Sequence, residues 1–540
     1  MLDRFRTRIA NRIWIASYYP TFFQFRRSLP NPARAQSRLL RDLVQKNAGT
    51  EYGMRYGFAE IHSPQDYANR VPVIGYGDVS REIERIAVGE TNILTAEATL
   101  RFEETSGSSS FARLIPYTKS LSMEFERAIG PWLFALHRQY PKAFRGRSYW
   151  SLSPATRARR ITSGGLTIGS ADDSEYFSMF ARILLRSILA IQPDIARISD
   201  PDGFYRRTLL ELLGCANLSL VSIWSPTYLL RLDERLRRDW TKLLDALRDH
   251  SPQRYSELKV LDPDSCTWQN IWPELELLSC WADASAGQFI SSLQDRTGGV
   301  PIQPKGLLST EGIISIPWMH GADPVAAVLS HFLEGEDLQS GEILPVWQWK
   351  RQARYSMIIS TGGGLYRFRT GDVVAVTGFV GETPCLHFEG RSSRNSDLVG
   401  EKLSEYQALQ MITQLRHSTE MQNLGAIFLY PRAGARCSYW ILVESGNAGP
   451  PGLALLQSAA AQADRALRQN PYYDQARNLG QLDGPLCRVI RRGGHGAIMR
   501  IIQQKKQIKD GDFKEPILLS SAEISIEELE PFLELHQSTN

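Results

Sequence analysis

The sequence is poor in cysteine and has no cysteine pattern that would hold a metal ion. None of its cysteines forms a Cys-x-x-Cys motif or has a histidine partner at ligand spacing, which disfavours a structural zinc site. Scattered thiols are typical of a reducing compartment, so we predict free cysteines and a cytoplasmic protein. The cysteines are Cys215, Cys266, Cys280, Cys385, Cys437 and Cys487.

Long apolar runs and an excess of one charge are also missing. A membrane-spanning helix needs about 20 apolar residues, and the best candidate, residues 179–191, is interrupted by Arg182 and Arg186. The 62 basic side chains face 58 acidic ones, which leaves a net charge of +4. That excess is too small for a dedicated nucleic-acid binder. The sequence therefore predicts neither a membrane span nor a nucleic-acid partner.

Residues 1–46 are locally basic and rich in aromatic side chains such as Trp14 and Phe25. This composition occurs in transit peptides and in helices that lie on a membrane surface. No cleavage-site pattern follows, which favours a pair of amphipathic helices packed on the body of the protein with their arginines facing water.

A chain of 540 residues is too long for one compact core. Helical and strand patterns alternate through the middle of the chain, and the pattern changes near residue 395. We therefore predict an α/β protein with a large, multi-layered N-terminal domain, residues 1–392, and a small α+β C-terminal cap, residues 393–540. The predicted elements are helices at 172–191, 228–247 and 453–468 and strands at 216–224, 425–430, 438–445 and 485–491.

The first motif with chemical potential is Glu-Thr-Ser-Gly-Ser-Ser-Ser at residues 104–110, followed by Arg113. Backbone N–H groups and hydroxyls in such a loop can surround phosphate oxygens, with a cation nearby. It is not a Walker loop, because no Gly-Lys-Ser/Thr ends it. A solvated serine-rich turn is the alternative.

The second motif is Ser-Thr-Glu-Gly at residues 309–312, between two apolar stretches. A magnesium ion that accompanies nucleotide phosphates typically takes one or two carboxylates, and Glu311 fits that role. The alternative is the start of a helix, with Glu311 in the first turn.

The third motif is Gly-Gly-Gly-Leu-Tyr-Arg-Phe-Arg-Thr-Gly-Asp at residues 362–372. Asp372 could accept hydrogen bonds from both hydroxyls of a ribose. Glu-Gly-Arg at 389–391 and Ser-Asp-Leu-Val-Gly-Glu-Lys at 396–402 follow. Near the C-terminus, Lys514 comes just after Gly511 in a turn-like segment. A cluster of lysines is otherwise typical of a solvated surface.

In this order, the motifs at 104–109, 309–312, 364–372 and 396–402 resemble those of the adenylate-forming superfamily. More closely, they are similar to the Gretchen Hagen family of acyl acid amido synthetases, in a bacterial-type form, from about residue 30 to residue 520. The resemblance implies a ligase that uses ATP and Mg²⁺. A small-molecule carboxylic acid would attack the α-phosphate to give an acyl adenylate and pyrophosphate, and an amine or amino acid would then displace AMP. Catalysis would come from alignment and charge stabilisation.

The resemblance also implies a role for individual residues. Lys514, Lys402 and Glu311 would be catalytic, Glu311 as the magnesium ligand, and Lys514 would neutralise the carboxylate and α-phosphate. The cap would rotate between the two steps, with its hinge within residues 391–398. The residues implied in ATP binding are Thr105, Ser106, Gly107, Ser108, Ser109, Arg113, Ser309, Thr310, Asp372 and Arg391.

The sequence departs from the family pattern at three positions. Ser110-Phe111 and Arg113 stand where relatives often have Gly-Gly and then Lys, and Leu307 replaces an aromatic residue before the Thr-Glu pair. Arginine keeps the charge but changes its geometry. Two alternatives therefore stay open: a ligase that passes the acyl group to a CoA or carrier-protein thiol, and a non-catalytic binding protein with the same fold. The acyl acid, the amine and the oligomeric state are not predicted.

Overall fold

The computed structural model describes residues 2–105, 113–150, 160–169, 184, 187–192, 195, 198, 200–319, 323–391, 395–417, 421, 424–434, 436–446, 449–506, 508 and 513–534. The chain separates into two compact units. Unit 1 comprises Met1–Asp283, Ile290–Thr370 and Val374–Phe388. Unit 2 comprises Ala284–Phe289, Gly371–Val373 and Glu389–Asn540. The domain boundary after residue 392 stays a prediction.

The N-terminal segment forms three helices in place of the predicted pair. Its exposed arginines face water, while Trp14 and Phe25 are fully buried, which favours the packed-helix interpretation. Asn31 fixes one helix start, because its side chain accepts a hydrogen bond from the Arg34 N–H. The helices before the first sheet are α1 (Leu2–Ser17), α2 (Tyr19–Ser28), α3 (Pro32–Lys46), α4 (Glu51–Arg55), η1 (Phe58–Glu60), α5 (Pro64–Arg70) and α6 (Tyr76–Ala87).

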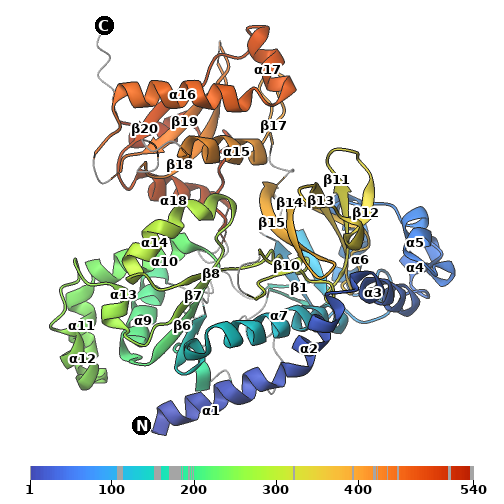
Figure 1. The fold of residues 1–540 in the computed structure, drawn as a ribbon, viewed down its shortest axis with the longest axis horizontal. Helices are drawn as coiled ribbons and strands as arrows, with labels where there is room; N and C mark the ends of the chain where they lie inside the picture. Colours follow the sequence, from blue (N-terminus) through green and yellow to red (C-terminus); the bar gives the residue numbers. More distant parts are fainter. Residues whose placement is uncertain are drawn as a thin grey trace. The chain divides into compact units, whose positions relative to one another are not determined.

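Three sheets build the rest of unit 1 (Figure 1). A four-stranded sheet has the order β2-β1-β5-β4, with β1 (Arg101–Thr105), β2 (Arg113–Tyr117), β4 (Arg160–Ile161) and β5 (Thr167–Ile168). A parallel sheet has the order β3-β6-β7-β8, with β3 (Arg147–Trp150), β6 (Leu218–Ser222), β7 (Leu277–Cys280) and β8 (Ile302–Pro304). The seven-stranded sheet has the order β12-β11-β13-β14-β15-β10-β9, with β9 (Ser315–Ile316), β10 (Val325–Ala326), β11 (Phe332–Asp337), β12 (Ile343–Pro345), β13 (Arg354–Ser360), β14 (Phe368–Val380) and β15 (Thr383–Arg391).

The parallel sheet is covered on both faces, as its continuous apolar strands require. Within β6, Val221 packs in one buried cluster and Leu220 in another, because successive side chains of a strand point to opposite faces. The predicted strand at 216–224 is thus confirmed as β6. Its surrounding helices are α7 (Lys119–Gln139), η2 (Pro141–Phe144), α9 (Pro201–Gly214), α10 (Pro226–Arg238), α11 (Trp240–His250), α12 (Pro252–Leu258), α13 (Trp268–Ile271) and α14 (Ile290–Thr297).

Two predicted helices have different outcomes. The single helix expected at 228–247 is wrong, because α10 and α11 are separated at Asp239, whose φ of −99° and ψ of 12° are not helical. Most of the helix predicted at 172–191 lies outside the described residues. Among the residues described, no helix is both long and apolar enough to cross a membrane.

Unit 2 is built on a three-stranded sheet with the order β18-β19-β20. Ile427 and Leu429 belong to one buried cluster, whereas Phe428 and Tyr430 belong to another. Both faces of the sheet are therefore covered. The strands predicted at 425–430, 438–445 and 485–491 and the helix predicted at 453–468 are confirmed as β18, β19, β20 and α16. The elements are η5 (Ala284–Phe289), β16 (Asn395–Ser396), β17 (Leu403–Ser404), α15 (Glu405–Arg416), β18 (Ile427–Arg432), β19 (Ser438–Glu444), α16 (Leu453–Leu467), α17 (Pro471–Asn478), β20 (Leu486–Ile490), α18 (Gly494–Lys506), α19 (Ile526–Leu529) and η8 (Glu530–Phe532).

Candidate functional site

The serine-rich motif connects the antiparallel strands β1 and β2. Thr105 pairs with Arg113 at the last position of the ladder, so both ends of the connection are fixed. Ser106, Gly107, Ser108 and Ser109 lie outside the described residues. The strand that leaves the loop is held by α6, because the Tyr76 hydroxyl accepts a hydrogen bond from the Leu114 N–H at 2.9 Å.

Arg113 lies beside the same tyrosine. The carbon at the centre of its guanidinium group is 5.4 Å from the centre of the Tyr76 ring, a distance at which a cation interacts with an aromatic face. The ring therefore supports a positive charge at the point where β2 begins. This is the cation that the sequence analysis assigned to ATP.

Residues 309–312 form a tight turn and not the start of a helix. The Ser309 N–H donates to the Gly312 carbonyl at 3.0 Å, and Leu308 and Ile313 form an antiparallel bridge on either side. Tyr117, the last residue of β2, donates its hydroxyl proton to the Thr310 carbonyl at 2.8 Å. The strand that follows the serine-rich motif is thus tied directly to this turn, which we call the 309–312 turn.

Glu311 occupies the tip of the 309–312 turn and is half-buried. Within the described part of the chain its carboxylate has no ion-pair or hydrogen-bond partner. No described group of three or more His, Cys, Asp or Glu side chains could hold a metal ion by itself. A magnesium ion bound with nucleotide phosphates needs only one or two protein carboxylates, so a single available carboxylate fits that ion.

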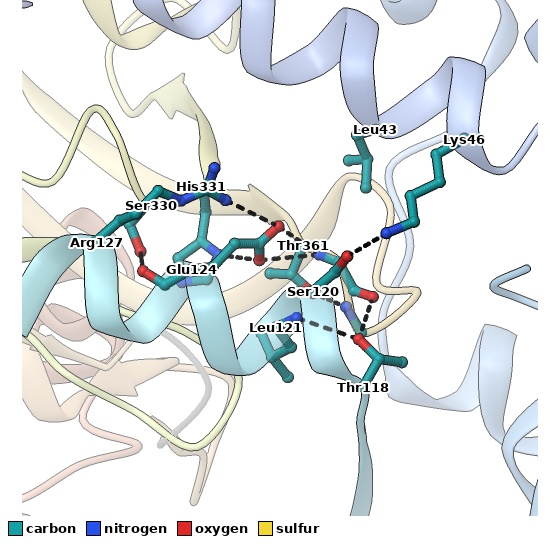
Figure 2. Close-up of polar contacts among 12 residues, drawn as sticks. Leu43, Lys46, Thr118, Ser120, Leu121, Glu124, Arg127, Ser330, His331 and Thr361 are labelled. Carbon is teal, nitrogen blue, oxygen red and sulfur yellow. Dashed lines mark hydrogen bonds and ion pairs between the residues drawn. The ribbon is translucent and has the colours of Figure 1, made fainter. Parts of the chain in front are cut away.

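The glycines of the third motif form a second tight turn between β13 and β14, which we call the 361–364 turn. The Thr361 N–H donates to the Leu365 carbonyl at 2.8 Å, and the Gly364 N–H donates to the Thr361 carbonyl at 3.1 Å. Figure 2 shows how α7 holds this turn. The Thr118 hydroxyl donates to the Gly362 carbonyl at 2.8 Å, and the Gly362 N–H donates to the Glu124 carboxylate.

Asp372 lies within β14 and groups with unit 2. Its side chain is only 2% exposed, and Oδ1 accepts a hydrogen bond from Arg391 Nε at 3.0 Å. The preceding Gly371 has a φ of +85°, which glycine adopts without strain. The structure therefore brings Asp372 and Arg391 together, and the ribose contact of Asp372 stays a prediction.

Lys402 and Lys514 are exposed side chains on firmly held backbone. The neighbour of Lys402, Glu401, is fully buried and accepts hydrogen bonds from the Leu398 and Val399 N–H groups. Lys402 Nζ lies 5.5 Å from the centre of the Tyr472 ring.

Lys514 lies between two buried residues, Phe513 and Glu515, which are 3% and 8% exposed. The carboxylate of Glu515 is 2.9 Å from His495 Nε2. Two lysines earlier in the described part of this segment form ion pairs, Lys505 with Glu528 and Lys506 with Glu523.

Sequence reasoning missed the residues that join these turns. Glu124 and His331 are 207 positions apart, yet His331 Nδ1 and Glu124 Oε2 are 2.8 Å apart. Neither residue belongs to a motif. No helix was predicted around Glu124. A charged residue among the apolar residues of segment 119–139 is the one signal that could have indicated it, because buried carboxylates are almost always paired.

Two family models match the chain. One describes the GH3 family N-terminal domain and matches residues 22–302, and the other describes the GH3 family central domain and matches residues 328–391. The indole-3-acetic acid-amido synthetase GH3.4 of Arabidopsis thaliana is 22% identical over 519 residues, covering 87% of this chain and 86% of that protein. The probable indole-3-acetic acid-amido synthetase GH3.2 of Oryza sativa subsp. japonica is 25% identical over 526 residues, covering 86% and 84%.

The fold is also similar to that of a solved structure. The AtGH3.15 acyl acid amido synthetase in complex with 2,4-DB superimposes with a TM-score of 0.84 at 19% identity, covering 95% of this chain and 96% of that one. The similarity extends over both units. Because the N-terminal family model alone matches more than half of the sequence, the chain belongs to the GH3 family.

Proposed function

We propose that the protein is an ATP-dependent acyl acid amido synthetase, a ligase that forms a carbon–nitrogen bond. In the first step a carboxylate oxygen attacks the α-phosphorus of ATP and pyrophosphate leaves, which produces an acyl adenylate. In the second step an amine nitrogen attacks the acyl carbon, AMP leaves with the bonding electrons, and the nitrogen loses a proton. Family membership supports this reaction class.

The structural observation that carries the proposal is the bond from Tyr117 to the Thr310 carbonyl at 2.8 Å. It joins the strand after the serine-rich motif to the 309–312 turn, although the two segments are 193 positions apart. Reactions of this kind require phosphate oxygens and the metal ligand to be aligned before substrates bind. A fixed link between the two motifs supports such alignment.

The roles of the individual residues follow from their chemistry. Arg113 carries a positive charge for phosphate oxygens. Lys402 and Lys514 have exposed ammonium groups, which suit the neutralisation of anionic substrates that approach each other. We propose that Lys514 acts on the carboxylate and α-phosphate in the adenylation step. The nucleotide contacts that we propose are those of Thr105, Ser106, Gly107, Ser108, Ser109, Ser309, Thr310, Asp372 and Arg391.

Glu311 would hold the magnesium ion. When bound, this ion neutralises phosphate charge and stabilises the developing negative charge. Glu311 is half-buried on a closed turn, which fixes the backbone from which its carboxylate extends. We also propose that the enzyme acts in the cytoplasm, since all six cysteines are free thiols.

The test is ATP–pyrophosphate exchange with Mg²⁺ across a panel of aryl and alkyl carboxylic acids, with Asp372→Ala as a control. Exchange with a subset of acids is the expected result. AMP release with that acid is then measured with amino acids and, separately, with CoA. If AMP is released faster with CoA than with any amine, the protein forms thioesters and the proposed amide-forming activity is wrong. Absence of exchange together with absence of ATP binding would contradict an enzymatic role.

A further inference from the structure

A buried carboxylate in α7 has no part in the chemistry described above. Glu124 is 7% exposed. Its two oxygens accept the Gly362 N–H at 3.0 Å and 2.9 Å, and Oε2 lies 2.8 Å from His331 Nδ1 (Figure 2). Because a carboxylate only accepts hydrogen bonds, the Nδ1 atom carries the proton. Glu124 therefore holds both the 361–364 turn and a histidine ring, and its Oε1 atom also lies 3.9 Å from Arg127 Nη2.

The His331 ring also contacts the 309–312 turn. The His331 side chain is fully buried, and a Cβ atom added at Gly312 would lie 2.8 Å from Nε2 and 2.9 Å from Cδ2. Real Cβ atoms almost never approach another atom that closely. The ring thus packs against the backbone of Gly312, the residue after Glu311. Within the described residues Nε2 makes no hydrogen bond, so packing is the contact that the ring makes with this turn.

Thr118, at the start of α7, also bonds the 361–364 turn. The Thr118 hydroxyl donates to the Gly362 carbonyl at 2.8 Å and accepts from the Leu121 N–H at 3.1 Å. Thr118 directly follows Tyr117, which bonds the Thr310 carbonyl. Two consecutive residues therefore contact the two different turns, and Glu124 and His331 contact the same two turns.

We propose that Glu124 and His331 are a pair of positioning residues for adenylation, which fix the 309–312 turn relative to the 361–364 turn. The pair sets where Thr310 and Glu311 lie, and both of its side chains are buried. Only the kinetic consequence of this inference rests on the proposed function. Displacement of a ligand-holding group by 1 Å costs up to about 100-fold in rate, so a loose turn is expected to slow the reaction.

The kinetic test compares Glu124→Gln with Glu126→Gln, a matched change two residues away on the same helix. In ATP–pyrophosphate exchange we expect Glu124→Gln to lower kcat/KM for ATP by about 10- to 100-fold. The Mg²⁺ concentration at half-maximal rate should rise, while KM for the acid stays unchanged. The control variant should match the wild type. If Glu124→Gln lowers the melting temperature but leaves the ATP and Mg²⁺ dependence unchanged, the pair only stabilises the fold. That result would overturn the proposal.

His331→Asn provides a second route if Glu124→Gln does not fold. Asparagine keeps an N–H donor for Glu124 and removes most of the ring from Gly312. We expect it to show the same selective rise in the Mg²⁺ requirement. An unchanged Mg²⁺ requirement would contradict a role for the ring in holding the 309–312 turn.

A structural test separates this inference from the proposed function. Gly312→Ala places a methyl group against the ring, so we expect faster hydrogen exchange at residues 309–314. Combining it with His331→Asn removes the clash and should bring exchange back toward the wild-type rate. Additive effects of the two changes would show that the residues are not coupled and would overturn the inference. Because no substrate is needed, this result stands even if no acid supports pyrophosphate exchange.

Discussion

The two units hold their candidate functional residues in opposite ways. In unit 1 both turns are closed by backbone hydrogen bonds, and buried side chains such as Glu124 and His331 reach them from other elements. In unit 2 the candidate side chains Lys402 and Lys514 are exposed, while the residues beside them are buried and fix the backbone. Unit 1 fixes whole turns, whereas unit 2 fixes the points from which its two lysine side chains extend. Asp372 differs from these lysines, because it is buried in unit 2 and bonded to Arg391.

The difference follows from what each chemistry needs. In the roles that we propose, a metal ligand such as Glu311 acts through its exact position, so the backbone that carries it must be restrained before the substrate arrives. A lysine acts as a compact charge on a flexible stem, so it can find its partner from an anchored base. Substitutions in unit 1 should therefore reduce stability and activity together, whereas loss of a lysine in unit 2 should reduce activity alone.

The largest effect is expected at Arg367, which follows the 361–364 turn. Its guanidinium group pairs with Glu334 through two contacts of 3.0 and 3.1 Å, and both residues are at most 5% exposed. Burial raises the pKa of Glu334 even though Arg367 opposes the rise. Arg367→Met leaves that carboxyl buried and unpaired, and should lower the free energy of unfolding by about 3–5 kcal/mol.

Urea unfolding measures this loss, and the double variant with Glu334→Gln is the control. Removing both charges should restore part of the stability, because the unpaired buried charge is gone. A loss below about 1 kcal/mol for Arg367→Met would mean that this ion pair does not anchor the chain after the 361–364 turn. The contrast drawn between unit 1 and unit 2 would then be wrong.

Lys514→Ala should have the next largest effect and should act on activity alone. Removal of one group that stabilises transition-state charge typically costs about 100- to 1,000-fold in rate, so pyrophosphate exchange should fall by that factor. The melting temperature should change little, because contacts of an exposed charged side chain contribute little to stability. Lys505→Ala, which removes a lysine paired with Glu528, is the matched control. Unchanged adenylation in Lys514→Ala would end the role assigned to this lysine.

Gly362→Ala should have a moderate effect on both properties. A Cβ atom there would lie 2.7 Å from Ser120 Cβ and 2.8 Å from Glu124 Oε1, so α7 and the 361–364 turn must separate. Overpacking of this kind costs about 1–3 kcal/mol. Gly378→Ala is the control, since its nearest atom would be 3.7 Å away. Equal unfolding curves for the two variants would contradict the close packing of turn and helix.

The smallest effect is expected at Glu97, which accepts a hydrogen bond from the Ser120 N–H at 2.8 Å at the start of α7. Burial opposes ionisation, but the bonds from Lys46 and Ser120 outweigh it and lower the pKa of Glu97 below its ordinary value of 4.5. A lowered pKa stabilises the folded state above pH 4.5, and this contribution is lost as the pH falls through the folded-state value.

Glu97→Gln should therefore lower the free energy of unfolding by about 0.3–1 kcal/mol at pH 7. The variant and the wild type should converge as the pH falls below about 4. Thermal unfolding at several pH values measures the difference. A gap that stays constant over this range would exclude ionisation of Glu97 as its cause.

Much of this arrangement could be predicted from local sequence. The cap strands were predictable because both of their faces are apolar and their ends carry turn residues. The 309–312 segment was ambiguous, since Ser-Thr-Glu-Gly suits both a helix start and a turn, and the Leu308 to Ile313 bridge that decides it is a pairing between strands. The break at Asp239 has no proline or glycine to mark it. The pair of Glu124 and His331 joins residues far apart in the chain, which no periodic pattern records.

The cysteines have a consequence for the fate of the activated acyl group. Burial raises the pKa of the Cys215 and Cys385 thiols to about 11, and that of the Cys280 and Cys487 thiols to about 12. At neutral pH roughly one such thiol in ten thousand or fewer is ionised, and the thiolate is the nucleophilic form. An acyl adenylate formed by this protein thus meets few competing sulfur nucleophiles in these four side chains. These four thiols are therefore poor acceptors for an activated acyl group at neutral pH.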